Sequence, residues 1–295
     1  MGSSLRHPAP ILGTTRLTAI FGDPVVHSLS PTMHNAAYAA LRLDRRYVAF
    51  HVTPRDLTAA LRGIRALGVL GVNLTVPHKE AALRAVDHVS AEGRLLGAIN
   101  CVINRKGSLL GDNTDALGLE RDLRKLGVRL RGRTVVVVGA GGGAASAALA
   151  ASRLGASRVV IANRTRSRAA ALARRCARAW RVGTVFEATG LASLRDAGLL
   201  AAAGCVINAT PMGLTTRSFV RMNYGATPRD CFFYDMLYAR TRTPFLRGAI
   251  RAHRKHADGA GMLVEQGELA FRLFNGAAAP RGVMRRALME ALGRK

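Results

Sequence analysis

A glycine-rich turn near the middle of the chain has the residue types and spacing needed to hold a phosphate group. Residues 134–138, one threonine and four valines, lead into Gly139, Gly141 and Ala144 at the G-x-G-x-x-A spacing. The two glycines let the backbone turn tightly and approach a pyrophosphate, which the free N–H groups and the dipole of the following helix would stabilise. Because this spacing alone is weak evidence, its context must decide. The predicted contact residues are Gly139, Ala140, Gly141, Gly142, Gly143 and Ala144.

The end of the next predicted strand, residues 159–163, bears on which dinucleotide would fit. A unit that binds NAD normally presents an acidic residue there to the ribose 2′-hydroxyl. This chain instead has Asn163, Arg164 and Thr165, with Arg168 one helical turn further on. A guanidinium group can hold a 2′-phosphate in a forked, charge-assisted pair, so we predict NADP as the cofactor. The alternative is that these arginines form only the solvated face of a helix.

Three groups in the first part of the chain have polar side chains at suggestive places. Ser28 and Ser30 lie two residues apart in a predicted loop, and their hydroxyls could bind a carboxylate, although Ser30 could equally be a helix N-cap. Asn73 and Thr75 share one face of a predicted strand because side chains alternate with a period of two. Lys79 follows at the junction between that strand and a helix, an unusual place for a solubilising lysine in a chain with five lysines.

Further polar residues lie where predicted strands begin or end. Asn100 lies at the start of a strand, and Asp115 closes a polar turn, residues 111–115, just before a predicted helix. Thr210 and Met212 follow a strand at residues 204–208. They lie at its carboxyl end, which is where an open parallel sheet places its ligands.

The elements that must position these residues alternate between strand and helix along the chain. The four valines suit a parallel strand that is buried on both faces. Predicted strands occupy residues 17–21, 46–52, 69–76, 97–102, 134–138, 159–163, 182–186, 204–208 and 231–235. Predicted helices occupy residues 32–41, 54–68, 79–86, 116–126, 245–256, 258–275 and 283–292, besides those that follow the glycine turn and residue 165. This pattern is typical of α/β proteins, and the first 115 residues would form a small α/β domain of their own.

Composition excludes several classes of function. At 295 residues the chain is long enough for two domains, and no apolar run approaches the roughly 20 residues that span a bilayer. The net charge of +26 comes from arginines spread over the whole length, with 5% aromatic residues and no nucleic-acid-binding motif, so we expect no specific nucleic-acid partner. The four cysteines are scattered without metal-ligand spacing, which favours a reducing cytoplasm and no metal. Residues 1–10 are predicted to be a disordered leader.

Eight short motifs, taken in chain order, resemble those of the shikimate dehydrogenase family. They occupy residues 27–34, 73–79, 97–100, 111–115, 163–165, 208–213, 234–238 and 261–266, and so cover nearly the whole chain. The resemblance implies a substrate domain, residues 1–115 with 259–295, and a Rossmann-type NADP-binding domain, residues 116–258, separated by a cleft. It implies the reversible NADPH-dependent reduction of 3-dehydroshikimate to shikimate, a step of chorismate and aromatic amino acid biosynthesis.

The resemblance also implies a role for individual residues. Lys79 and Asp115 would be the catalytic pair. Hydride transfer to a ketone builds negative charge on oxygen, and a lysine beside it could both stabilise that charge and supply the proton. Whether Lys79, Asp115 or water moves the proton stays open, and a purely structural ion pair is the alternative. The residues implied to bind substrate are Ser28, Ser30 and Tyr238 at the carboxylate and Asn73, Thr75, Asn100 and Gln266 at the ring hydroxyls; Thr210, Met212 and Gly261 would contact the cofactor.

Other functions within and outside the family remain possible at this stage. A relative that acts on quinate or an aminoshikimate, or that uses NAD, would share these motifs. A catalytically silent ligand-sensing or nucleic-acid-associated module is a more distant alternative, and the intact Lys79 and Asp115 argue against it because a binding module need not keep an acid/base pair. The partner would be a small molecule, and the chain would be a monomer or homodimer. Two departures from the family pattern stand out: Ala116 replaces a common glycine, and residues 215–229 carry Arg217 and Arg221 in place of a Met-x-Pro continuation.

Overall fold

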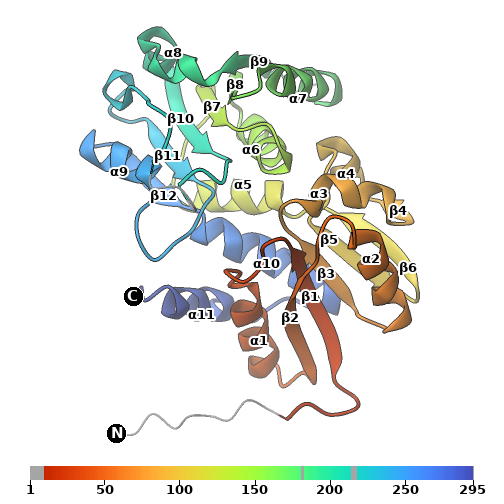
Figure 1. The fold of residues 1–295 in the computed structure, drawn as a ribbon. Coiled ribbons are helices and arrows are strands. Elements are labelled where there is room, and N and C mark those ends of the chain that lie inside the picture. The colour runs from red at the N-terminus through yellow and green to blue at the C-terminus, as the bar shows by residue number, and fades with distance from the viewer. Residues whose placement is uncertain (1–9, 181–182, 214–217, 295) are drawn as a thin grey trace, which may run out of the picture.

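The computed structural model describes residues 10–180, 183–213 and 218–294, and these residues form two α/β halves (Figure 1). Within that part of the chain, each half is built on one six-stranded sheet. The predicted α/β fold with two domains is therefore confirmed. The leader, Arg217 and the start of the strand predicted at residue 182 lie outside the described residues.

The first sheet has the strand order β2-β1-β3-β5-β6-β4. Strand β1 pairs in parallel with β2 and β3, whereas β5 runs antiparallel to β3 and β6. Successive side chains of a strand point to opposite faces of the sheet. In β1, Ile20 packs in one hydrophobic core, and Ala19 and Phe21 pack in another, so both faces of this sheet are buried. The strands are β1 (Arg16–Gly22), β2 (Arg45–His51), β3 (Gly71–Leu74), β4 (His88–Val89), β5 (Cys101–Arg105) and β6 (Ser108–Asp112). The helices are α1 (Ser30–Ala40), α2 (Leu57–Ala66), α3 (His78–Ala81), η1 (Ala82–Arg84) and α4 (Ala91–Leu96).

The second sheet is parallel throughout, in the order β12-β11-β10-β7-β8-β9. Counted from β7, this is the 3-2-1-4-5-6 order of a dinucleotide-binding fold, and the order in which strands are added to the sheet reverses between β7 and β10. The strands are β7 (Thr134–Val138), β8 (Arg158–Asn163), β9 (Val185–Gly190), β10 (Ala203–Asn208), β11 (Phe232–Asp235) and β12 (Lys255–Asp258). The helices are α6 (Gly142–Arg153), α7 (Arg166–Ala179), η2 (Leu191–Arg195), α8 (Ala197–Ala201), η3 (Tyr224–Ala226) and α9 (Pro244–Arg251).

Two helices connect the halves. Helix α5 (Asp115–Lys125) runs between the two sheets, and α10 (Ala260–Asn275) lies across it before the chain ends with α11 (Val283–Ala291) (Figure 1). A Cβ atom at Gly118 of α5 would come within 2.8 Å of the Gln266 side chain, so glycine allows the two helices to touch. This contact fixes α10 against the start of α5, next to Asp115.

Several predicted elements differ from those of the structure. The helix predicted to reach residue 256 ends at Arg251, because His253 takes a positive φ of 55°, and the chain then forms β12. The polar turn at residues 111–115 overlaps the end of β6, and the helix predicted over 79–86 divides into α3 and η1. Ala116 is fully buried in α5. In the described part of the chain, no helix combines the length and apolarity needed to cross a membrane.

Candidate active site

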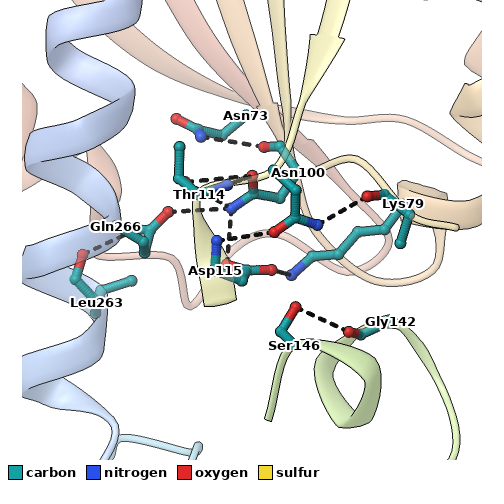
Figure 2. A network of polar contacts seen from close by, with 11 residues as sticks. Asn73, Lys79, Asn100, Thr114, Asp115, Gly142, Ser146, Leu263 and Gln266 are labelled. Carbon is teal, nitrogen blue, oxygen red and sulfur yellow. Dashed lines mark hydrogen bonds and ion pairs between the residues drawn. The ribbon is translucent and has the colours of Figure 1, made fainter. Parts of the chain in front are cut away.

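Lys79 and Asp115 meet where the two halves adjoin. The Lys79 Nζ atom donates to Asp115 Oδ2 at 2.6 Å (Figure 2). The Asp115 side chain is only 6% exposed, so the carboxylate is enclosed, whereas the Lys79 side chain is 22% exposed. Asp115 begins helix α5, where the unpaired N–H groups of the first turn favour a negative charge.

Asn100 holds the other oxygen of the same carboxylate. Its Nδ2 atom donates to Asp115 Oδ1 at 2.7 Å and lies 3.4 Å from Gln266 Oε1 (Figure 2). Its own Oδ1 accepts from the backbone N–H of Thr114 at 2.8 Å. Asn100 therefore orients Asp115 and brings Gln266 of α10 into the same network.

Backbone hydrogen bonds place Asn100 and Lys79 beside each other. The Asn100 N–H donates to the Asp112 carbonyl at 3.0 Å, and the Asn100 carbonyl accepts from the Leu74 N–H at 2.8 Å, so Asn100 connects the ends of β6 and β3. The Ile99 N–H donates to the Lys79 carbonyl at 2.9 Å, which ties the start of α3 to the same segment. The two side chains thus converge because three short segments share one hydrogen-bonded junction.

Asn73 and Thr75 occupy the end of β3 and the residues just after it. The Asn73 Nδ2 atom donates to the Asn100 carbonyl at 3.1 Å, and its Oδ1 accepts from the Tyr47 hydroxyl at 2.8 Å. Thr75 is half-buried, and its N–H donates to the Phe21 carbonyl. The structure therefore brings Asn73 into the network of Lys79 and Asp115, with Thr75 two residues further along the same segment.

The serine pair lies at the start of α1. The first helical residue is Ser30, and the N-cap is Leu29, without a side-chain cap hydrogen bond. The alternative that Ser30 is merely an N-cap is therefore wrong. An N-cap at Ser30 would start the helix at Pro31, whereas α1 begins at Ser30 itself. Ser30 is buried, Ser28 is half-buried, and the Ser28 hydroxyl accepts from the Ser30 N–H at 3.3 Å. Burial raises the pKa of Tyr238, and a hydrogen bond with the Leu29 backbone opposes that rise, so Tyr238 also lies at this helix start.

The glycine turn lies next to Lys79. Gly139 has a φ of +121°, and a Cβ there would come within 3.0 Å of the Ala209 carbonyl oxygen. A Cβ at Gly142 would lie 3.8 Å from Lys79 Cβ, and Figure 2 shows Gly142 and Ser146 beside the lysine. Helix α6 begins at Gly142, so its first N–H groups, which lack partners in the helix, are close to the Lys79 and Asp115 pair. Ala140, Gly141 and Gly143 are half-buried, and Ala144 is buried against the core.

The arginines at the end of β8 are exposed. Asn163 is half-buried, and its Nδ2 atom donates to the Thr165 carbonyl at 3.0 Å, which shapes the turn into α7. Among the described residues, neither Arg164 nor Arg168 forms an ion pair or a side-chain hydrogen bond with the protein. Their guanidinium groups therefore remain available to an anion at the strand end where a ribose would lie.

A buried carboxylate supports the loop after β10. Asp235 accepts from Asn208 Nδ2 at 2.9 Å and from the Thr243 hydroxyl at 2.5 Å, and burial raises the pKa of Asp235 to about 6. Asn208 in turn accepts from the Thr210 N–H at 3.1 Å, and the Thr210 hydroxyl lies 3.3 Å from the Met212 N–H. This chain of contacts fixes the loop that carries Thr210 and Met212, and a Cβ at Gly139 would lie 3.1 Å from Thr210 Cγ2.

Gly261, in the first turn of α10, lies against Asp122 of α5. A Cβ there would come within 2.0 Å of Asp122 Oδ1, and the Asp122 carboxylate accepts from the Tyr234 hydroxyl at 2.7 Å. The observed function of this glycine is thus to let α10 approach Asp122. Its contact with a cofactor stays a prediction. Arg221, in the unusual loop, is exposed.

Three residues that sequence reasoning did not single out complete the network. Asn113 accepts from the Asp115 N–H at 2.9 Å and donates to the Ala98 carbonyl at 2.8 Å, and Thr114 contacts Asn100. Their place in the polar turn before Asp115 was the available signal. Tyr47, the third, gave no signal, because it lies 26 residues from Asn73 in a strand that carries no motif. Among the described residues no cluster of three or more His, Cys, Asp or Glu is suited to a metal ion.

Family models match three parts of the chain. The model described as the shikimate dehydrogenase substrate binding domain matches residues 20–102. The model described as shikimate / quinate 5-dehydrogenase matches residues 122–214, and that of the shikimate 5′-dehydrogenase C-terminal domain matches residues 259–289. The three matches follow the order of the two sheets and the final helices.

Individual proteins are similar over nearly the full length. The shikimate dehydrogenase (NADP(+)) of Geobacter sp. strain M21 is 44% identical over 283 residues, which cover 96% of this chain and 97% of the relative. A crystal structure of a shikimate dehydrogenase in complex with NADP+ matches with a TM-score of 0.87 at 32% identity, covering 96% of this chain and 98% of the other. That of the Thermus thermophilus shikimate 5-dehydrogenase, with NADP(H) and shikimate, matches with a TM-score of 0.82 at 35% identity, covering 94% and 100%. The chain therefore belongs to the shikimate dehydrogenase family.

Proposed function

We propose that this chain is an NADP-dependent shikimate dehydrogenase, which reduces 3-dehydroshikimate to shikimate and catalyses the reverse reaction when shikimate and NADP+ are supplied. The observation that carries the proposal is the contact between Lys79 and Asp115 at 2.6 Å, beside the start of helix α6. The full-length similarity to proteins of that name supports the same activity. The reaction would serve aromatic amino acid biosynthesis through chorismate.

The residues around the glycine turn fit a dinucleotide. A side chain at Gly139 would meet the Ala209 carbonyl, so glycine lets the turn pass close to the loop after β10, and the backbone N–H groups that follow in the turn are the candidate phosphate donors. The pyrophosphate would bind at these groups and at the start of α6. Arg164 and Arg168, which have no acidic partner among the described residues, would hold the 2′-phosphate. Thr210 and Met212 would line the nicotinamide side.

Bound NADPH supplies the hydride, and Lys79 supplies the proton. The Lys79 ammonium group would stabilise the negative charge that reduction builds on the carbonyl oxygen of the substrate, and would donate a proton to that oxygen. Asp115 keeps the ammonium group in place, and Asn100 fixes the carboxylate through its second oxygen. The partial exposure of Lys79 lets water restore its proton.

The remaining polar residues would bind the substrate. The carboxylate would lie at Ser28, Ser30 and Tyr238, which meet at the start of α1. The ring hydroxyls would lie between Asn73, Thr75, Asn100 and Gln266. In this proposal a polyhydroxylated acid would bind between the first sheet and helix α10. The proposal also assigns residues 1–115 and 259–295 to the substrate domain and residues 116–258 to the cofactor domain.

The test is the absorbance change of the reduced nicotinamide with each pair of substrate and cofactor. We expect turnover with shikimate and NADP to exceed turnover with shikimate and NAD, or with quinate and either cofactor. Faster turnover with quinate would move the assignment to the quinate-using branch of the family, and no turnover with any pair would contradict it. The enzyme would work in the cytoplasm as a monomer or homodimer, where its four cysteines, all free and buried, stay reduced.

A further inference from the structure

Tyr47 is bonded to Asn73, one of the proposed substrate-binding residues, although it lies outside every motif. Its side chain is 1% exposed, and its hydroxyl donates to Asn73 Oδ1 at 2.8 Å. Because Oδ1 of an amide can only accept, the single proton of Tyr47 must be used in this bond. Burial raises the pKa of Tyr47 well above its ordinary value, so the hydroxyl keeps its proton.

The Asn73 amide is thereby held at both ends. Its oxygen accepts from Tyr47, and one of its two N–H groups donates to the Asn100 carbonyl at 3.1 Å. A rotation that exchanged the two ends would place the oxygen against the Asn100 carbonyl, where two acceptors would repel each other. The second N–H of Asn73 has no acceptor among the described residues. Figure 2 shows Asn73 beside Asn100.

Packing fixes Tyr47 itself. The His34 ring stacks on the Tyr47 ring with centroids 4.2 Å apart and an angle of 22° between the planes. His34 is 1% exposed, and burial lowers its pKa to about 3, so it stays neutral and adds no charge beside Tyr47. In addition, Asn35 bonds the backbone of Tyr47 in both directions at 2.8 Å. The hydroxyl therefore has a fixed position relative to Asn73.

We propose that Tyr47 is a positioning residue for substrate recognition, which holds the Asn73 amide so that an N–H group faces a ring oxygen of the substrate. This inference rests on the proposed function, because it assumes that Asn73 binds the ring. With its oxygen bonded to Tyr47, the Asn73 side chain can only donate a hydrogen bond to the substrate. The chemical consequence is that the substrate must present an oxygen with a free lone pair at this position.

The test is a double-mutant cycle with Tyr47→Phe and Asn73→Ala. Without its donor, the Asn73 oxygen is left unpaired in a buried place or turns away, so we expect Tyr47→Phe to raise the KM for shikimate about 10-fold. The KM for NADP should change less than twofold, since no contact of Tyr47 involves the glycine turn. If Tyr47 acts through Asn73, adding Tyr47→Phe to Asn73→Ala should change the KM for shikimate less than about twofold.

Tyr38→Phe is the matched control. Tyr38 is fully buried in the same aromatic cluster, and its hydroxyl lies 2.8 Å from the Thr18 hydroxyl, so this variant also loses one buried hydrogen bond. Both variants should lower the melting temperature similarly, while Tyr38→Phe leaves the KM for shikimate unchanged. An unchanged KM in Tyr47→Phe, or an equal rise with and without Asn73, would overturn the proposal. Wild-type turnover of shikimate with NADP, measured in the same assay, tests the proposed function separately.

Discussion

Lys79 is the residue on which the proposed chemistry depends most directly. Its only acidic contact among the described residues is Asp115, and both side chains lie beside the start of α6. A structural ion pair would contribute to stability and leave turnover intact, whereas a proton donor would determine the rate. The two possibilities therefore differ in what a variant at this position should lose.

We expect Lys79→Ala to lower turnover about 10²- to 10⁴-fold, as for loss of a general acid, while shikimate binding weakens far less. Steady-state rates and calorimetric binding of shikimate measure the two effects. Lys125→Ala is the matched control, because Lys125 lies at the opposite end of α5 from Asp115 and pairs with the buried Glu265 at 2.5 Å, so this variant also breaks an ion pair with a buried carboxylate and should lower stability more than turnover. Near-normal turnover in Lys79→Ala would make the pair a structural one.

Arg164 is the residue whose exposure matters most for cofactor choice. It follows β8 at the end of the strand and has no ion-pair partner among the described residues. We expect Arg164→Ala to raise the KM for NADP at least about 10-fold and that for NAD by less than twofold, because only NADP carries the 2′-phosphate. Arg178→Ala, at the far end of α7, should change neither. Equal changes in the KM values for NADP and NAD would mean that the 2′-phosphate binds elsewhere.

At the scale of elements, helices α5 and α10 control how the halves are joined. Two glycines allow their close approach, Gly118 against Gln266 and Gly261 against Asp122. The Tyr234 hydroxyl of β11 donates to the same Asp122 carboxylate at 2.7 Å, and burial raises the pKa of Asp122. One buried cluster thus connects the second sheet to both helices, and α10 carries Gln266 into the network of Asn100.

We expect Gly261→Ala to push α10 away from α5, because its Cβ would stand 2.0 Å from Asp122 Oδ1. Overpacking of this kind costs about 1–3 kcal/mol, and the displaced Gln266 should raise the KM for shikimate. Denaturant unfolding and kinetics measure the two effects. Gly267→Ala in the same helix is the control, since its Cβ would meet ordinary contacts at 3.4 Å or more. If the two variants had the same effect on stability and KM, the cause would be the change in helix propensity and not the contact between residue 261 and Asp122.

Central elements were predictable from the sequence, and peripheral ones were not. The four valines of β7 and the glycine turn before α6 give strong local signals, and both are where the pattern predicts them. Strand β4 has two residues, and β12 follows a left-handed residue, His253, so neither gives a periodic signal of its own. Motifs identified Lys79 and Asp115, whereas Tyr47 could be found only from a contact between β2 and β3.

At the scale of the whole molecule, the net charge of +26 should affect how ligands arrive. The proposed substrate is an acid and the proposed cofactor carries several phosphate charges, so both are anions. A strongly positive protein attracts anions over distances of about a Debye length, roughly 10 Å at 0.1 M salt. The effect would add to the specific contacts of Arg164 and Arg168, and salt would screen it.

We therefore expect kcat/KM for NADP to fall about 10-fold as sodium chloride rises from about 20 mM to about 500 mM, with a smaller fall for NAD. The difference follows because NADP carries the additional phosphate, whereas hydride transfer and the contact between Lys79 and Asp115 are the same with both cofactors. Saturating rates should change little with salt, since steering acts before binding. Parallel slopes for the two cofactors would mean that the excess charge lies too far from the site to act on the 2′-phosphate. A flat response for both would mean that the arginines serve some property other than ligand capture.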